Sequence, residues 1–175
     1  ITVFGSIDAK DEKIIFKSLK NIYPLGTTDL INQNKYLILI PHETDTKTID
    51  RLSNQLEELS LEYCKYSTLL SSCALNNVMI VDVIGLLADL YEYSTKAYVG
   101  GGFSRGVHSV LEPAIYNCTI GYGPNIEMLD EAKFLVNNSY AKIIHNENDM
   151  NNFLFSNEVM KKYNLFNQSN AINIL

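Results

Sequence analysis

Short apolar runs alternate along the chain with longer segments in which apolar residues recur every three or four positions. The first kind is typical of buried β-strands and the second of amphipathic helices. The alternation continues to about residue 144, and neither an internal repeat nor a linker interrupts it. A polar, Asn-rich segment with helical character closes the chain. The predicted strands are Ile1–Ser6, Tyr36–Ile40, Val78–Val81, Lys96–Val99, Thr119–Tyr122 and Ala141–Ile144, and the predicted helices are Asp11–Tyr23, Asp45–Tyr63, Ile84–Tyr93, Val107–Tyr116 and Ile126–Val136.

Most of these strands are apolar at every position, so both of their faces are expected to be covered. Strands of this kind that alternate with helices indicate a parallel sheet with helices on both faces. We therefore expect one Rossmann-like, doubly wound α/β domain over residues 1–175. In such sheets, ligands bind beyond the carboxyl ends of the strands, near the point where the strand order reverses. The loops that follow the predicted strands are Gly5-Ser6, Pro41-His42, Asp82–Gly85, Gly100–Ser109 and Gly123–Asn125.

Charge and hydropathy exclude two classes of partner for this domain. The chain has 14 Lys and Arg against 20 Asp and Glu, a net charge of −6, whereas a nucleic-acid surface needs clustered basic residues. No apolar run approaches the roughly 20 residues that cross a bilayer. The chain begins directly on strand-like residues at Ile1, without an initiator Met. We therefore expect a fragment of a longer, two-domain chain, cut at a domain boundary.

Three consecutive glycines, Gly100 to Gly102, follow the strand Lys96–Val99. A dinucleotide fingerprint needs glycines at the first, third and sixth positions of the turn, but the sixth position counted from Gly100 is Arg105. An ATP-binding P-loop needs a Lys after its last Gly, and Val107 stands there. The sequence therefore excludes both kinds of loop.

The same segment has other features that suit an anion. Glycines let backbone N–H groups approach a ligand closely, and a helix starting near Val107 would add unpaired N–H groups and the positive end of its dipole. Arg105 offers a charged contact. His108 and Glu112 are four residues apart and would share a helical face, with Glu112 suited to accept hydrogen bonds from two ribose hydroxyls. The alternative is a tight turn that packs helix on sheet, with Glu112 solvated.

These residues also carry a resemblance to a known family. The run VDVIGLLADLYEYSTKAYVGGGFSRGVHSVLEPA and the later IGYGPN resemble the donor-binding half of 3-deoxy-D-manno-octulosonic acid (Kdo) transferases. The segments GSIDAKDE and LILIPHE resemble the first two loops of that half, and the motifs follow in the family's order from Gly5 to about Val136. The resemblance implies the C-terminal domain of a GT-B glycosyltransferase.

The resemblance also implies a reaction, the inverting transfer of Kdo from CMP-Kdo to lipid A in lipopolysaccharide synthesis. It implies no metal and no cofactor beyond the CMP-Kdo donor substrate. In the family, the catalytic base is a Glu of the N-terminal, lipid-facing domain. We therefore expect no catalytic residue in this chain and no transferase activity from it alone. The lipid A-type acceptor and the membrane would be contacted through the other half, at the cytoplasmic face of a Gram-negative inner membrane, while this fragment is expected to be soluble.

Carried over position by position, the resemblance predicts donor contacts on four loops and a ribose contact at Glu112. Two departures stand out: Ser109 occupies a position where the family often has Asn, and Ile7-Asp8 replaces a common Thr-Trp pair. The predicted donor-binding residues are Gly5, Ser6, His42, Gly101, Gly102, Arg105, Gly106, His108, Ser109, Glu112 and Asn125.

Two other interpretations remain open at this level. Other GT-B enzymes, such as a UDP-sugar transferase or a nucleotide-sugar 2-epimerase, use similar glycine loops and ribose-binding glutamates. A non-catalytic binding or assembly domain that keeps the same fold is the second.

Overall fold

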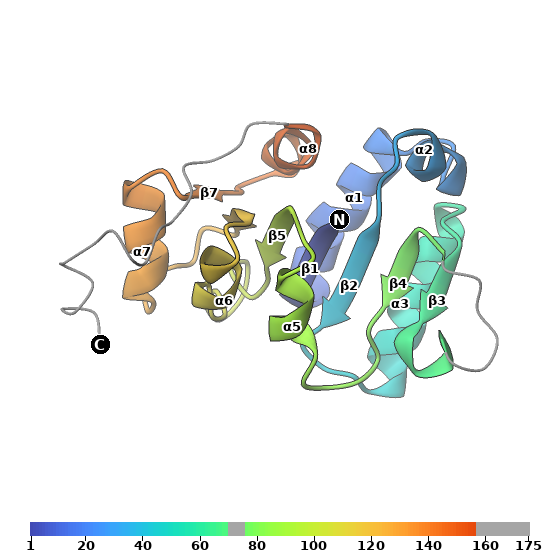
Figure 1. Ribbon diagram of the computed structural model, residues 1–175, viewed down its shortest axis with the longest axis horizontal. Coiled ribbons are helices and arrows are strands. Elements are labelled where there is room, and N and C mark those ends of the chain that lie inside the picture. The colour runs from blue at the N-terminus through green and yellow to red at the C-terminus, as the bar shows by residue number, and fades with distance from the viewer. Residues whose placement is uncertain (70–75, 157–175) are drawn as a thin grey trace.

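A computed structural model describes residues 1–69 and 76–156 of the chain. Its centre is a seven-stranded sheet in the order β3-β4-β2-β1-β5-β6-β7, and every neighbouring pair is parallel (Figure 1). The strands are β1 (Thr2–Ile7), β2 (Leu37–Pro41), β3 (Tyr63–Lys65), β4 (Val78–Ile80), β5 (Lys96–Val99), β6 (Thr119–Tyr122) and β7 (Ala141–Ile143).

Helices cover both faces of this sheet. Between the strands lie α1 (Ala9–Ile22), α2 (Thr27–Asn32), α3 (Thr46–Glu58), the 3₁₀ turn η1 (Tyr66–Thr68), α5 (Leu87–Tyr91), α6 (Leu111–Ile115) and α7 (Asp130–Asn137). Helix α8 (Glu147–Phe155) follows the last strand.

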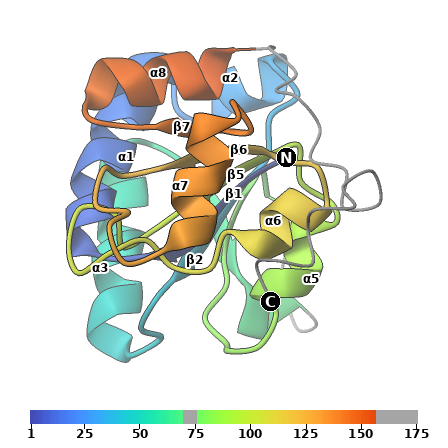
Figure 2. The same ribbon diagram turned by 90° about the vertical axis from the view of Figure 1, so that its left-hand side faces the viewer.

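Two hydrophobic cores lie on opposite sides of the sheet, because successive strand side chains point to opposite faces. Phe4, Leu39 and Tyr98 pack with residues of α1, α2, α3 and α8 in one core. Val3 and Val99 pack with residues of α5, α6 and α7 in the other. Figure 2 shows α1 and α8 on one side of the strands and α5 and α6 on the other. The predicted doubly wound α/β class is confirmed.

The strand order reverses between β1 and β5. From β1 the chain moves through β2 toward the β3 edge, and β5 then pairs with the opposite side of β1 and leads to β6 and β7. The loops after β1 and β5 therefore lie side by side at the carboxyl edge, where ligands bind in open parallel sheets.

Helix α1 starts two residues earlier than the predicted Asp11, because Asp8 caps it. The Asp8 carboxylate accepts from the N–H groups of Lys10 and Asp11, and the Asp11 carboxylate accepts from the Asp8 N–H in return. This reciprocal capping box satisfies N–H groups that the first turn leaves without helical partners.

The predicted helix Asp45–Tyr63 is wrong at its end. Helix α3 stops at Glu58, Ser60 adopts a left-handed φ of 55°, and Tyr63 begins the edge strand β3. Gly26 makes this turn possible, because a Cβ on it would lie 2.2 Å from the Ser60 carbonyl oxygen. The short helix α2 after Gly26 was not predicted either, since its six residues are too few to show a clear periodicity.

The other boundaries agree more closely, and the predicted closing helix is confirmed in part. α5 and α7 are shorter than the predicted Ile84–Tyr93 and Ile126–Val136. Helix α8 packs on α1 and buries Met150 and Phe153. The remainder of the Asn-rich segment lies outside the described residues.

A buried ion pair joins α1 to α3. Glu12 is 2% exposed, and its two carboxylate oxygens accept from Nε and a terminal nitrogen of Arg51, both at 2.8 Å. Gln55 donates to the same carboxylate at 2.9 Å. A charge buried this deeply is tolerated because it is paired and hydrogen-bonded.

We predict that Arg51→Ala lowers the free energy of unfolding by about 2–3 kcal/mol, because it leaves the Glu12 carboxylate buried without its charged partner. Urea denaturation measures this change. Arg105→Ala is the matched control, since Arg105 is exposed, and should change stability by less than about 0.5 kcal/mol. Equal losses in the two variants would contradict the structural role of the pair.

Candidate functional site

Three loops meet at the carboxyl edge of the sheet at backbone-to-backbone distance. A Cβ on Gly100 would lie 2.2 Å from the Ser6 carbonyl oxygen, and a Cβ on Gly102 would lie 2.7 Å from backbone atoms of Gly123. Because backbone atoms cannot move aside as flexible side chains can, only glycine fits at these contacts. The glycine cluster therefore lets the β5 loop pack against the loops that follow β1 and β6.

Asp11 holds the glycine loop in place through hydrogen bonds from its buried carboxylate. Its side chain is fully buried and accepts from the Gly101 N–H at 2.8 Å, the Tyr98 hydroxyl at 2.8 Å and the Asp8 N–H at 3.0 Å. Burial raises the pKa of Asp11 above its ordinary value, against the effect of these hydrogen bonds. One carboxylate thus ties β5, the glycine loop and the start of α1 together.

A second carboxylate holds the outer part of the loop. The Ser104 hydroxyl donates to Asp8. Burial opposes the charge on Asp8, but the hydrogen bonds from Ser104 and from two backbone N–H groups hold its pKa below the ordinary value. Asp8 and Asp11, the two acidic residues at the start of α1, therefore both have hydrogen-bond partners in the loop after β5.

Asn125 closes the loop from the β6 side. Its side-chain amide donates to the Ser104 carbonyl at 2.9 Å and its N–H to the Gly102 carbonyl at 2.9 Å, while its own carbonyl accepts from the Val107 N–H at 3.0 Å. The structure thus gives Asn125 a role in holding the loop, and its predicted donor contact stays a prediction.

The helix predicted to begin near Val107 is wrong at its start, because α6 begins at Leu111. The N–H of Val107 is bonded to Asn125 and that of His108 to the Gly100 carbonyl, so neither offers an unpaired group to an anion. Gly106 has a φ of 134°, outside the helical range. The predicted helix-dipole site at Val107 and the predicted helical face shared by His108 and Glu112 are therefore both absent.

The loop instead brings two histidines together that are far apart in sequence. His42, just after β2, stacks on His108 with ring centroids 4.4 Å apart and an interplanar angle of 17°. Burial, and next the neighbouring His42, lower the pKa of His108. Gly101, with a φ of 87°, lies under the His108 ring, which a Cβ there would approach to 3.0 Å.

Glu112 is the second residue of α6 and is half-buried. Its carboxylate accepts from the Ser109 hydroxyl at 2.5 Å, so Ser109 is directed at Glu112. Arg105 is exposed at the tip of the loop. Among the predicted donor-binding residues, Glu112 is the one that lies on helix α6, beyond the glycine loop.

The residues predicted on the first loop have structural contacts. A Cβ on Gly5 would lie 2.2 Å from the Tyr91 hydroxyl, so Gly5 makes room for α5 against β1. The Tyr91 side chain is 1% exposed, and its hydroxyl has no hydrogen-bond partner among the described residues. Ser6 has a left-handed φ of 52° and directs its carbonyl at Gly100.

Sequence reasoning missed Asp11, Tyr98 and Ser104 as parts of this site. Two signals were available for Asp11: its place in the segment GSIDAKDE and its spacing from Asp8, which matches a capping box. The contact of Asp11 with Gly101 joins residues 90 positions apart, and no local pattern encodes it.

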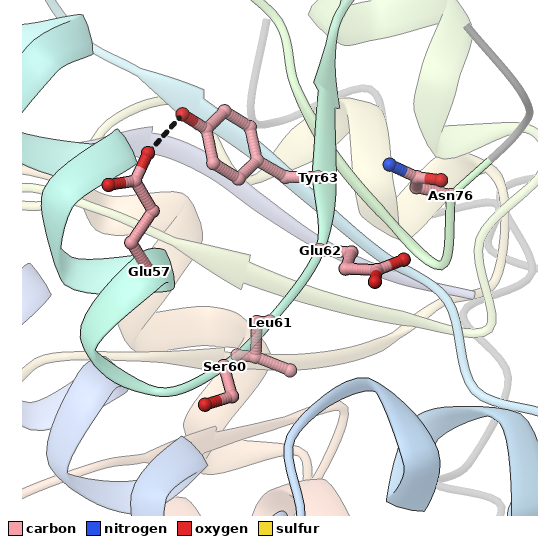
Figure 3. Close-up of a pocket in the computed structure, with 6 residues that line it drawn as sticks. All are labelled: Glu57, Ser60, Leu61, Glu62, Tyr63 and Asn76. Atoms are coloured by element: carbon pink, nitrogen blue, oxygen red, sulfur yellow. Dashed lines mark hydrogen bonds between the residues drawn. The ribbon is translucent and has the colours of Figure 1, made fainter.

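Two surface hollows lie away from these loops. One has a volume of about 600 Å³ and is lined by residues such as Glu57, Tyr63 and Asn76 (Figure 3). The other, about 760 Å³, runs along α3 past Asp50 and Asn54. Neither contains a predicted donor-binding residue.

Within residues 1–69 and 76–156, no group of three or more His, Cys, Asp or Glu side chains is arranged to hold a metal ion. In the same ranges, no helix has the length and apolarity to cross a membrane.

The fold is the Rossmann-like α/β fold of a GT-B glycosyltransferase domain. It superposes on the C-terminal CMP-Kdo binding domain of WaaA from Acinetobacter baumannii with a TM-score of 0.72. The sequence identity is 19%, and the match covers 87% of this chain and 77% of that domain. The predicted GT-B class of fold is confirmed.

Sequence relatives identify the enzymes to which the chain is related. It is 28% identical to 3-deoxy-D-manno-octulosonic acid transferase of Rickettsia typhi over 184 aligned residues, 99% of this chain and 34% of that enzyme. It is 27% identical to the Aquifex aeolicus enzyme of the same name, over 85% of this chain and 39% of that one. The predicted resemblance to Kdo transferases is confirmed, and the chain spans about one third of the length of these relatives.

One further relative is named for two activities. A bifunctional glycosyltransferase/methyltransferase of Fusobacterium nucleatum is 32% identical over 126 residues, 70% of this chain and 18% of that protein. No protein-family model matches the chain. The similarity therefore rests on individual relatives and on the fold.

We predict that Asp11→Ala destabilises the domain by about 2–4 kcal/mol, since it leaves the buried Gly101 N–H and the Tyr98 hydroxyl without their acceptor. Tyr98→Phe removes only one of these hydrogen bonds and is expected to cost about 1 kcal/mol. Urea denaturation gives the stabilities, and amide hydrogen exchange at Gly101 should accelerate in Asp11→Ala alone. Unchanged exchange at Gly101 would contradict the role of Asp11 in holding the glycine loop, which we call the Asp11 clamp.

Proposed function

We propose that this chain is the donor-binding part of an inverting Kdo transferase and that its ligand is CMP-Kdo. One observation carries the proposal: in a chain related over 99% of its length to a Kdo transferase, the loops after β2, β5 and β6 converge beside the reversal of strand order. The donor identity rests on the relatives, and the geometry supplies the groups that would hold a nucleotide.

The donor phosphate is proposed to lie against the glycine loop beside the stacked histidines. Gly101 and Gly102 bring the backbone close to that position without side chains in the way. Arg105 extends from the same loop and would supply a planar, charged pair of donors. Gly106 completes the turn, and the absence of a Cβ leaves this side of the loop accessible.

The ribose is proposed to bind at Glu112. A carboxylate accepts hydrogen bonds only, and two vicinal hydroxyls match its two oxygens. The Ser109 hydroxyl occupies one of these oxygens at 2.5 Å and holds the carboxylate in one orientation. Ribose binding would then need only a short rotation of Ser109 or a shared acceptor.

In the proposed reaction an acceptor hydroxyl attacks the anomeric carbon while CMP departs on the opposite face. This chain would hold the departing phosphate and the ribose, and no residue of it is assigned as the base. The Kdo transferase relatives are about three times as long as this chain. We assign binding of the lipid A-type acceptor, the catalytic base and contact with the inner membrane to the part of such a protein that this chain does not include.

Other GT-B enzymes and a non-catalytic domain remain as alternative functions. A UDP-sugar transferase or 2-epimerase would bind UDP in preference to CMP. In a non-catalytic binding or assembly domain, replacement of Glu112 by Ala would lower the stability and leave the ligand affinity unchanged.

We predict that Glu112→Ala weakens CMP binding about 5- to 150-fold, which corresponds to about 1–3 kcal/mol for a lost charged hydrogen-bond acceptor. The wild-type chain should prefer CMP to 2′-deoxy-CMP, and the variant should lose that preference. Isothermal titration measures both, with Glu92→Ala, an exposed acid just after α5, as the control.

A variant that keeps full CMP affinity and only loses stability would contradict the ribose assignment. Equal weakening by Glu92→Ala would point to a general charge effect instead.

A further inference from the structure

His42 and His108 form the one stacked pair of rings among the predicted donor-binding residues. The two rings come from loops after different strands, β2 and β5, and lie 4.4 Å apart and nearly parallel. His42 is half exposed at its side chain and His108 is half-buried beside Gly101. An incoming phosphate at the glycine loop would therefore meet both imidazoles.

Two imidazoles this close cannot both be charged without strong repulsion, because like charges oppose each other's protonation. Burial and the neighbouring His42 keep the pKa of His108 low. A bound anion reverses this balance, since it favours the charged form of a neighbouring imidazole. Binding of an anion and uptake of a proton are then thermodynamically linked.

We propose that the His42–His108 pair takes up one proton when a phosphate monoester binds, and so distinguishes the spent nucleotide from the nucleotide sugar. This inference rests on the proposed function. The phosphate of a nucleotide sugar is a diester with one negative charge. When its bond to the sugar breaks, the electron pair stays on the phosphate oxygen, and the monoester that leaves carries up to two negative charges at neutral pH. The proton that neutralises the added charge comes from solvent.

Acidic groups near His42 and His108 favour the uptake of a proton by the pair. Glu43 lies 3.8 Å from His42 through its Oε1 and the imidazole Nε2, and Asp8 favours the charged form of His108. Asp11 is bonded to the other side of Gly101. Arg105, on the same loop, is exposed, and Glu112 lies beyond the loop on α6.

The proposal is tested by titrating CMP into the chain at pH 7.5 in two buffers of different ionisation enthalpy. The phosphate of CMP itself titrates near pH 6, so uptake at pH 7.5 reports the protein. We expect up to one proton taken up per CMP, and an affinity that falls by up to tenfold per unit as the pH rises from 7 to 8.5. CMP methyl ester, a diester with one charge fewer, should bind with less uptake.

Two variants assign the proton to the pair. The double variant His42→Gln/His108→Gln should bind CMP more weakly and without uptake, since either imidazole left alone can still accept a proton, whereas His145→Gln, an exposed histidine outside the site, should retain both the affinity and the uptake. The comparison of CMP with its methyl ester uses the wild-type chain, so the test stays valid even if the double variant does not fold.

Each failure has a separate meaning. CMP binding without proton uptake, uptake that survives in the double variant His42→Gln/His108→Gln, or equal uptake with CMP and its methyl ester would overturn this inference and leave the proposed function standing. No CMP binding by the wild-type chain would overturn the proposed function, and this inference with it.

Discussion

The buried carboxylate of Asp11 is the contact on which the site depends. It accepts from the Gly101 N–H, the Tyr98 hydroxyl and the Asp8 N–H, so it links the glycine loop to β5 and to the start of α1. The glycines complete the junction, since Gly100 and Gly102 let the loops after β1, β5 and β6 pack backbone against backbone. The glycine loop is therefore held by its contacts with β5, with the start of α1 and with the loops after β1 and β6.

The site lies along the carboxyl edge of the sheet, beside the reversal of strand order, and the loops place His42, His108 and Glu112 along it. The two hollows described elsewhere on the surface share no residue with it. The chain spans about one third of the length of relatives such as the Rickettsia typhi enzyme.

The fold was predictable where local patterns determine it. The fully apolar strands and amphipathic helices indicated the doubly wound class and the loops to examine, because strands buried on both faces are continuous apolar runs and helices covered on one face have a three- to four-residue period. The three-residue strand β3 was missed, since Tyr63 also fits the apolar face of α3. The late start of α6 was missed as well, because the N–H groups of Val107 and His108 find partners at Asn125 and Gly100 that only the folded chain brings near. The Asp11 clamp and the histidine stack are long-range contacts of the same kind.

The most direct test of the account is to follow backbone amide shifts by NMR while CMP, UDP and NAD are titrated separately into the chain. The account predicts that CMP binds with the highest affinity and that the largest shifts fall on Gly101 to Glu112 and on His42. Preferential binding of UDP or NAD, or shifts centred on the hollow at Glu57 and Tyr63, would contradict it.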